Sequence, residues 1–241
     1  MSPFEAPGPV CRLAFGAMAD SHSPRPPAVL FDLDGTLIDT IELILSSARH
    51  AFAGWPRGAP TDEDWTLGIG TPLVNQLRSY AQSDEEVAVL LERYRAYQDI
   101  HHDRLTRCYD DVPAELARLA DRGHPLGVVT SKASGIASRS LAHVGLEKYF
   151  PVVIGYDDTT RHKPDPEPVL AGLARLNVPA SRAVYVGDSP HDIHAGNAAG
   201  VVTVAALWGP FSRETLVEAG PNHFIGCLAD LPGVLAQAFG A

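Results

Sequence analysis

Cysteine, basic residues and long apolar runs are all scarce in this sequence. Its three cysteines, Cys11, Cys108 and Cys227, lie far apart and lack metal-ligand spacing, which is typical of free thiols in a reducing cytoplasm. No apolar run approaches the length that crosses a bilayer. Lysine and arginine total 19 against 29 acidic residues, for a net charge of −10. That balance disfavours a nucleic-acid partner, because binding to a phosphate backbone depends on excess basic side chains.

The first 27 residues have the composition of a flexible tail. They contain six of the 20 prolines and no apolar stretch of the kind found in a signal peptide. The chain has two methionines, Met1 and Met18, and we expect Met18 to be the native start.

Five short apolar segments predict the strands of a sheet. Apolar residues make up 45% of the 241-residue chain, which is enough for a sizeable core. The segments are continuous and rich in β-branched residues, as strands buried on both faces should be. They are residues 28–31, 125–130, 152–155, 183–187 and 201–205. Helical patterns at 113–122, 134–144, 166–176 and 192–199 alternate with them and predict an α/β fold with a doubly wound parallel sheet.

The first crossover between strands is abnormally long. About ninety residues separate the first two predicted strands, where a crossover needs about a dozen. Helical periodicity within this segment predicts helices at 40–52, from about 62, at 72–80 and at 84–100. We therefore predict a core of residues 28–39 and 110–241. Residues 40–109 would form a small helical domain, the cap, over the carboxyl ends of the strands.

Two aspartates follow the first predicted strand. The sequence FDLDGT at 31–36 places Asp32 and Asp34 two positions apart. Residues i and i+2 of an extended chain point the same way, so both carboxylates should project from the carboxyl end of the strand, where open α/β sheets bind ligands. Two like charges at close range need a cation or a shared proton. The pair therefore predicts a magnesium site or an acid/base pair.

Hydroxyl groups end the second predicted strand. Thr130 and Ser131 stand in the sequence VVTSK at 128–132, and a helix opens near residue 134, so an anion could bind here. A helix-capping turn explains these residues equally well. Lys132 could reach a substrate anion or remain a solvated lysine.

A lysine and two aspartates complete the polar motifs. The sequence KPDP at 163–166 opens a helix, and its prolines restrain the backbone around Lys163. In GDSPHD at 187–192, Asp188 and Asp192 stand four positions apart across a strand-to-helix turn. Both could face a magnesium ion, which prefers oxygen ligands. Asp192 could also cap the following helix.

Together these four motifs resemble those of the haloacid dehalogenase superfamily of phosphohydrolases. Asp-x-Asp-Gly-Thr, the threonine of the second motif, Lys-Pro-x-Pro and Gly-Asp-Ser-x-x-Asp stand in that family's order. The Thr-x-Lys of the second motif and the small helical cap resemble the phosphoglycolate phosphatase and pyrophosphatase-like branch. The resemblance implies a Rossmann-like core with the cap inserted just after the first motif.

The resemblance also implies a role for each motif residue. Asp32 would be the nucleophile that forms an aspartyl-phosphate, and Asp34 the general acid and base. The implied magnesium ligands are Asp32, the backbone carbonyl of Asp34 and Asp188, with Asp192 behind them as an outer ligand or as a partner of Lys163. The implied substrate-binding groups are Gly35 through its amide, Thr130, Ser131 and Lys163.

The expected activity is magnesium-dependent hydrolysis of a small phosphate monoester, as in a phosphoglycolate phosphatase. A pyrophosphatase of the same branch is the alternative. A sugar phosphomutase shares the cap type, but mutases of this family usually carry Glu-Asp-Ser-x-x-Gly where this chain has Gly187 and Asp192. Asp34 disfavours a dehalogenase, and the complete acidic set disfavours a non-catalytic binding protein. The expected partner is a small-molecule phosphate, and we expect neither a membrane nor a nucleic acid as a partner. We expect the protein to be cytoplasmic and either a monomer or a homodimer.

One loop of the predicted cap is a candidate for contact with the site. The sequence GIGTP at 68–72 contains two glycines, which permit close approach of the backbone to a ligand. A plain turn between helices is the alternative. We expect this loop to enter the site and help to select the leaving group.

Overall fold

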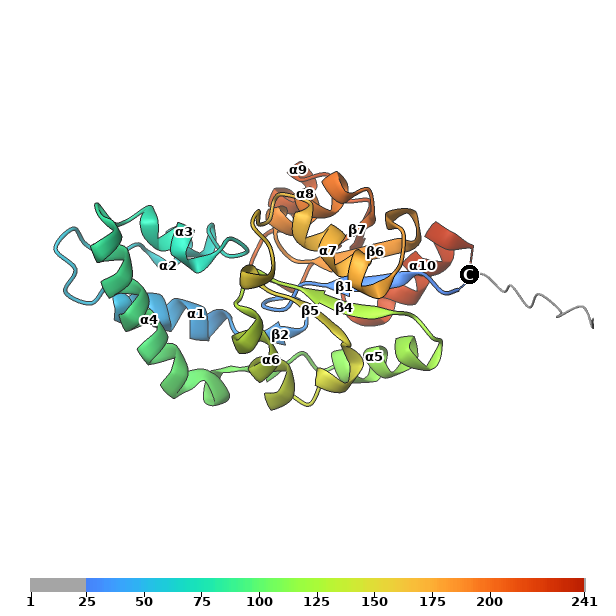
Figure 1. The fold of residues 1–241 in the computed structure, drawn as a ribbon, viewed down its shortest axis with the longest axis horizontal. Helices are drawn as coiled ribbons and strands as arrows, with labels where there is room; N and C mark the ends of the chain where they lie inside the picture. The colour runs from blue at the N-terminus through green and yellow to red at the C-terminus, as the bar shows by residue number, and fades with distance from the viewer. Residues whose placement is uncertain (1–24, 241) are drawn as a thin grey trace, which may run out of the picture.

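The computed structural model describes residues 25–240, which form a six-stranded sheet with helices on both faces (Figure 1). All neighbouring strands are parallel, in the order β5-β4-β1-β6-β7-β8. The strands are β1 (Ala28–Phe31), β4 (Leu126–Val129), β5 (Val152–Ile154), β6 (Ala183–Gly187), β7 (Val202–Ala206) and β8 (His223–Ile225). The predicted doubly wound α/β fold is confirmed. The predicted start at Met18 and most of the predicted tail lie outside the described residues.

Alternate residues of each strand are buried under helices on opposite faces. Val29 and Phe31 of β1 belong to one buried cluster, and Ala28 and Leu30 belong to another. The first cluster is covered by α5 (Val112–Asp121), α6 (Ser134–His143) and α10 (Leu231–Phe239). The second is covered by α7 (Glu167–Leu176) and α8 (Pro190–Ala199). Burial on both faces explains why these strands are apolar throughout.

The first four of the five helices between β1 and β4 form a separate group. They are α1 (Ile41–Ala51), α2 (Asp62–Thr66), α3 (Leu73–Arg78) and α4 (Asp84–Leu105), and they lie together at one end of the sheet (Figure 1). They share a buried cluster of their own, which includes Phe52, Trp65 and Tyr94. A short antiparallel pair, β2 (Ile38–Asp39) with β3 (Arg107–Cys108), joins the two chain segments that lead to and from these helices. We call residues 41–105 the helical insert. The domain limits at residues 40 and 109 stay a prediction.

Some elements differ from those expected from the sequence. Strand β8 and the short helix α9 (Arg213–Glu218) were not predicted, because three residues at a sheet edge and six residues beside it give too short a pattern. Helix α4 continues past residue 100 to Leu105, because its polar last turn buries His102 beside Ser140 of α6. Short 3₁₀ turns occur at Glu147–Tyr149, Tyr156–Asp158, Ala180–Arg182 and Leu228–Asp230. None of the helices within residues 25–240 is long and apolar enough to cross a membrane.

Candidate active site

Three strands bring predicted motif residues to one place. Because β1 lies between β4 and β6, the residues that follow these strands, Asp32, Thr130 and Asp188, meet at the carboxyl edge of the sheet. Their exposed fractions are 5%, 4% and 1%, respectively. Each strand is a short apolar run that ends where the first polar side chain appears, so the sequence itself places these groups at the edge.

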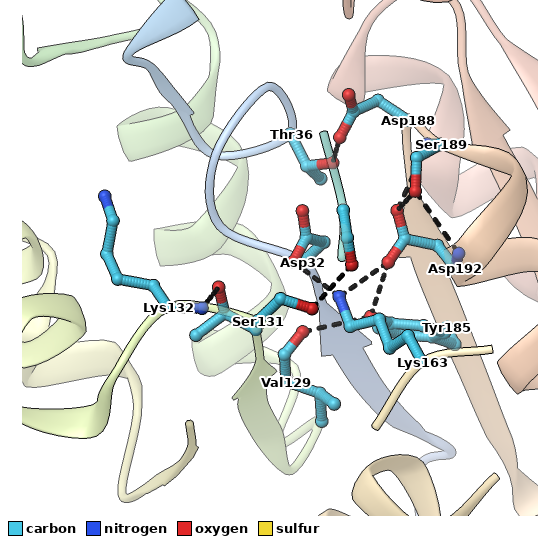
Figure 2. A network of polar contacts seen from close by, with 12 residues as sticks. Asp32, Thr36, Val129, Ser131, Lys132, Lys163, Tyr185, Asp188, Ser189 and Asp192 are labelled. Atoms are coloured by element: carbon cyan, nitrogen blue, oxygen red, sulfur yellow. Dashed lines mark hydrogen bonds and ion pairs between the residues drawn. The ribbon is translucent and has the colours of Figure 1, made fainter. Parts of the chain in front are cut away.

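Lys163 lies between two buried carboxylates (Figure 2). Its Nζ atom is 2.7 Å from Asp32 Oδ1 and 2.6 Å from Asp192 Oδ1. The lysine side chain is 1% exposed, so carboxylates rather than water stabilise its charge. Burial disfavours the charged amine, but the charges of Asp192 and Asp32 outweigh burial and raise the pKa of Lys163. The lysine is therefore cationic at neutral pH and is held against Asp32.

Both carboxylate oxygens of Asp192 already have partners. Oδ1 accepts a hydrogen bond from Tyr185 Oη at 2.9 Å, in addition to the one from Lys163. Oδ2 accepts from the Ser189 backbone N–H at 3.1 Å and from Ser189 Oγ at 2.6 Å, which closes a capping box at the start of α8. Burial acts to raise the pKa of Asp192, but the Lys163 charge and these hydrogen bonds lower it. Asp192 is therefore an ionised partner of the lysine and of the helix.

Asp188 differs, because one of its oxygens has no partner. Oδ1 accepts a hydrogen bond from Thr36 Oγ1 at 2.6 Å, whereas Oδ2 is buried and unpaired within residues 25–240. The backbones of Gly35 and Gly209 lie so close to this carboxylate that a Cβ atom at either position would clash with it. Burial, followed by the charge of Asp32, raises the pKa of Asp188 well above its usual range. A cation beside Oδ2 would relieve this cost.

The donor set of this site suits a magnesium ion. Oxygens of Asp32, Asp188 and Asp192 lie within 4.8 Å of one another. Burial also raises the pKa of Asp32 to about 7, in spite of the neighbouring Lys163. Buried like charges with an unpartnered oxygen need a positive charge close by. Because Asp192 is engaged elsewhere, Asp32 and Asp188 are the side chains that fit the ion, and the backbone carbonyl of Asp34 stays a predicted third ligand.

Two side chains hold the carboxylate of Asp34. Its Oδ1 atom accepts hydrogen bonds from Lys132 Nζ at 2.6 Å and from Thr40 Oγ1 at 2.5 Å. The Lys132 side chain is 8% exposed, so it is an ion-pair partner and not a solvated lysine. Asp34 and Lys132 line the same cavity as Asp32. The ion pair therefore fixes the predicted general acid in the cavity that contains the predicted nucleophile.

The second motif lines this cavity and contacts the loop at 68–72. Thr130 and Ser131 are both lining residues. The Thr130 hydroxyl accepts a hydrogen bond from the Lys132 backbone N–H at 3.2 Å, and Ser131 Oγ donates to the Gly70 carbonyl at 2.6 Å. Gly70 has a φ of 98°, a conformation that favours glycine. The loop predicted to enter the site is thus joined directly to the core.

Gly35 is placed differently from its predicted role. Its amide was expected to bind substrate, but its N–H donates to the Ile38 carbonyl at 2.8 Å, and Gly35 does not line the cavity. The residue has a φ of 88° and contacts the Asp188 carboxylate. Its lack of a side chain therefore serves the tight turn and the close approach to Asp188.

Sequence reasoning missed Thr36 and Tyr185 as parts of the site. Thr36 Oγ1 orients Asp188. Tyr185 Oη lies 2.9 Å from Asp192 Oδ1 and 3.0 Å from the Val129 carbonyl. Tyr185 stands in the apolar strand sequence AVYVG, where it has the pattern of a core residue. The only available signal is that a buried tyrosine hydroxyl needs a polar partner.

A cavity joins the motif residues to the helical insert. It contains about 870 Å³ of empty space, including its open mouth. The motif side is lined by Asp32, Asp34, Thr130, Ser131 and Lys132. The insert side is mostly apolar and is lined by Ile44, Ile69, Leu73, Val74 and Tyr94, together with Gln76, Arg95 and Gln98. A small molecule could place a phosphoryl group at the motif side and its remaining part among the insert residues.

The fold and the site together define a class of α/β hydrolytic enzyme. Its marks are a parallel sheet, a helical insert after the first strand, and buried carboxylates with a lysine at the carboxyl edge. The chain matches the family described as haloacid dehalogenase-like hydrolase over residues 29–206, and it belongs to that family. The resemblance noted from the motifs is confirmed, and the protein is an enzyme of the phosphoric ester hydrolase type.

Named relatives and solved structures agree with this assignment. The chain is 37% identical over 207 residues to pyrophosphatase PpaX of Bacillus velezensis, covering 86% of this chain and 95% of the relative. Pyrophosphatase PpaX of Anoxybacillus flavithermus is 36% identical, with the same coverage. A structure from Clostridium acetobutylicum, described as a predicted phosphatase, has a TM-score of 0.78 at 26% identity and covers 88% of this chain and 99% of that chain. The structure of a predicted phosphoglycolate phosphatase from Haemophilus somnus has a TM-score of 0.79 at 22% identity and covers 88% of this chain and 99% of that chain. At this identity the similarity is one of fold alone.

Proposed function

We propose that this enzyme is a magnesium-dependent phosphatase that hydrolyses a small phosphate monoester through an aspartyl-phosphate, in the manner of a phosphoglycolate phosphatase. The observation that carries the proposal is the burial of Asp32, Lys163 and Asp188, from three separate motifs, at one edge of the sheet. The order of these motifs and the family of the chain support the same reaction.

In the first half-reaction Asp32 is the nucleophile. One of its carboxylate oxygens attacks phosphorus in line with the leaving oxygen, and the bond from phosphorus to that oxygen breaks. Asp34 donates a proton to the leaving oxygen, so the product departs as a neutral hydroxyl group. The Lys132 and Thr40 contacts hold the Asp34 carboxylate in the cavity for this transfer.

In the second half-reaction water attacks phosphorus in the aspartyl-phosphate. Asp34 accepts a proton from the water, and the bond between phosphorus and the Asp32 oxygen breaks. Phosphate leaves and the Asp32 carboxylate is regenerated. Lys163 stabilises the negative charge on Asp32 and, with Thr130 and Ser131, on the phosphoryl oxygens.

Asp32 and Asp188, with the backbone carbonyl of Asp34, would hold the magnesium ion. When bound there, the ion offsets the charge of the phosphoryl oxygens. The unpaired oxygen of Asp188 supports this placement. In this proposal Asp192 is not a ligand of the ion and instead positions the Lys163 ammonium group.

A second candidate substrate is pyrophosphate. The relatives from Bacillus velezensis and Anoxybacillus flavithermus, which match most of this chain's length, are named pyrophosphatases. The same residues could carry out that reaction, with phosphate as the leaving group. For either substrate we propose action as a monomer or homodimer in the cytoplasm, with the helical insert as a cap that selects the leaving group.

Phosphate release tests the proposed function. Wild-type enzyme is incubated with magnesium and p-nitrophenyl phosphate, phosphoglycolate or pyrophosphate, beside Asp32→Asn and the remote control Asp121→Asn. We expect release by the wild type and the control, none by Asp32→Asn, and none when magnesium is chelated. Release by Asp32→Asn at the wild-type rate would reject Asp32 as the nucleophile. No release by the wild type would reject the proposed phosphatase.

A further inference from the structure

The insert side of the cavity is lined by a largely buried glutamine whose amide has no hydrogen-bond partner within residues 25–240. Gln98 of α4 is 7% exposed and lines the cavity. No hydrogen bond joins its amide to another residue between 25 and 240. The Gln98 amide atoms are not among the buried unpartnered atoms of residues 25–240, so they are accessible from the cavity that the residue lines. We therefore expect the molecule that enters the cavity to supply the partner of Gln98.

Arg95 lines the same cavity three positions earlier on α4. Residues three apart lie on one side of a helix, so Arg95 and Gln98 are neighbours. The other cationic lining residue, Lys132, is already paired with Asp34. Arg95 forms no ion pair with any residue that the structure describes between 25 and 240. Arg95 is an exposed residue, so its guanidinium is the available positive charge at the open part of the insert side.

The surroundings of these two residues restrict what they could bind. Ile44, Leu73 and Val74 make the neighbouring wall apolar, so a charge that enters this part of the cavity needs a paired partner. A guanidinium presents parallel N–H groups that match the two oxygens of a carboxylate or a phosphate. The Gln98 amide adds a further N–H donor on the same helix.

We propose that Arg95 and Gln98 form a subsite for an oxyanion at the far end of the leaving group, either a carboxylate or a second phosphate. The proposal rests on the proposed function and identifies the class of substrate at that same site. The motif residues bind the phosphoryl group that is transferred, and α4 binds the opposite end of the substrate. Arg95 and Gln98 thereby favour anionic leaving groups over neutral groups of the same size.

Three substrates and four variants test the subsite. The substrates are phosphoglycolate, pyrophosphate and 2-hydroxyethyl phosphate, which replaces the carboxylate of phosphoglycolate with a neutral hydroxymethyl group. The variants are Arg95→Gln, Gln98→Leu and the control Arg104→Gln, an exposed arginine on α4 that does not line the cavity. The measurement is kcat/KM for each pair of enzyme and substrate, with Arg95→Lys added to test whether the charge alone restores selectivity.

We expect wild-type enzyme to prefer one anionic leaving group to the neutral one. Arg95→Gln and Gln98→Leu should lower that preference on the order of 10- to 100-fold, the effect of losing a hydrogen bond to a charged group. Arg104→Gln should leave it unchanged, and Arg95→Lys should restore part of it. A selective loss with phosphoglycolate identifies a carboxylate subsite, and one with pyrophosphate identifies a phosphate subsite.

Other results would overturn the subsite without rejecting the phosphatase. Equal losses on all three substrates would show a general effect on the site. An equal loss of preference in Arg104→Gln would show long-range attraction by surface charge. A wild-type preference for 2-hydroxyethyl phosphate would show that the cavity selects neutral groups. Failure to hydrolyse any of these substrates or p-nitrophenyl phosphate would instead reject the proposed function.

Discussion

Lys163 Nζ lies 2.6 Å from Asp192 Oδ1, and this ion pair joins the third and fourth motifs beneath the predicted nucleophile. Both side chains are almost fully buried, with 1% of the lysine and 0% of the aspartate side chain exposed. The same ammonium group contacts Asp32. Two carboxylates therefore share one cation, and the charge at Asp32 depends on how Asp192 holds the lysine.

Replacement of Lys163 tests how much its buried ion pairs contribute to the stability of the protein. Lys163→Met keeps most of the length of the side chain but leaves Asp32 and Asp192 buried without their cation. We expect the free energy of unfolding to fall by about 3–5 kcal/mol, as when one partner of a buried ion pair is removed. Urea unfolding measures this change, with exposed Lys148→Met as the control. A loss no greater than that of the control would show that the buried ion pair does not contribute to stability.

The two aspartates of the fourth motif should respond differently to substitution. Asp188→Asn removes the charge beside the unpaired oxygen, so magnesium binding measured by calorimetry should be lost or severely weakened. Asp192→Asn removes the partner of Lys163, so it should chiefly lower the free energy of unfolding. Equal loss of magnesium binding in both variants, with both still folded, would assign Asp192 as a direct ligand.

A substitution at Gly209 tests the position of Asp188 without changing any of the proposed magnesium ligands. A Cβ atom at Gly209 would clash with the Asp188 carboxylate, whereas a Cβ atom at Gly233 meets no atom within 4 Å. Gly209→Ala should therefore displace Asp188 at a cost of about 1–3 kcal/mol, and raise the magnesium concentration for half-maximal activity on the order of tenfold or more. Gly233→Ala should have the wild-type magnesium requirement. An unchanged requirement in Gly209→Ala would contradict the position of Asp188.

His102 gives the molecule a pH-dependent contact between the insert and the core. Burial lowers the pKa of His102 from its usual 6.5, and its Nε2 lies 2.8 Å from Ser140 Oγ of α6. A depressed histidine pKa favours the neutral form in the folded state. Its stabilising contribution is complete above the unfolded pKa and is lost as the pH falls through the folded pKa.

The stability difference between wild type and His102→Gln should therefore be constant above about pH 7 and shrink as the pH falls below about 6. Urea unfolding across this range isolates the histidine, because other titrating groups are common to both proteins. A difference that grows on acidification would mean that His102 is charged in the folded state.

The sequence was most informative where a strand ends in a polar residue. The positions of Asp32, Thr130 and Asp188 follow from short apolar runs of a parallel sheet, so their meeting at one edge could be predicted. The place of Lys163 in the site could be predicted only from the resemblance to a family, because no local pattern shows that a lysine after an irregular loop turns inward. Its contact with Asp192 depends on tertiary packing across 29 residues of sequence.

Other features depend on contacts that no pattern in the sequence reveals. Tyr185 has the pattern of a core residue, yet its hydroxyl contacts Asp192. Lys132 pairs with Asp34 across 98 residues. The amide of Gly35 turns to Ile38 because the Asp-Gly-Thr segment closes a tight turn, which a motif cannot show. The cavity residues Arg95 and Gln98 lie on a helix whose periodicity indicates only burial or exposure.

Chemical trapping of the covalent intermediate tests the central claim most directly. Wild-type enzyme turning over substrate with magnesium is quenched with borohydride, which reduces an aspartyl-phosphate to homoserine, and its peptides are analysed by mass spectrometry. We predict homoserine at position 32, unchanged Asp34 and Asp188, and no homoserine without substrate. Homoserine at another aspartate, or none at any position while phosphate is released, would contradict Asp32 as the nucleophile.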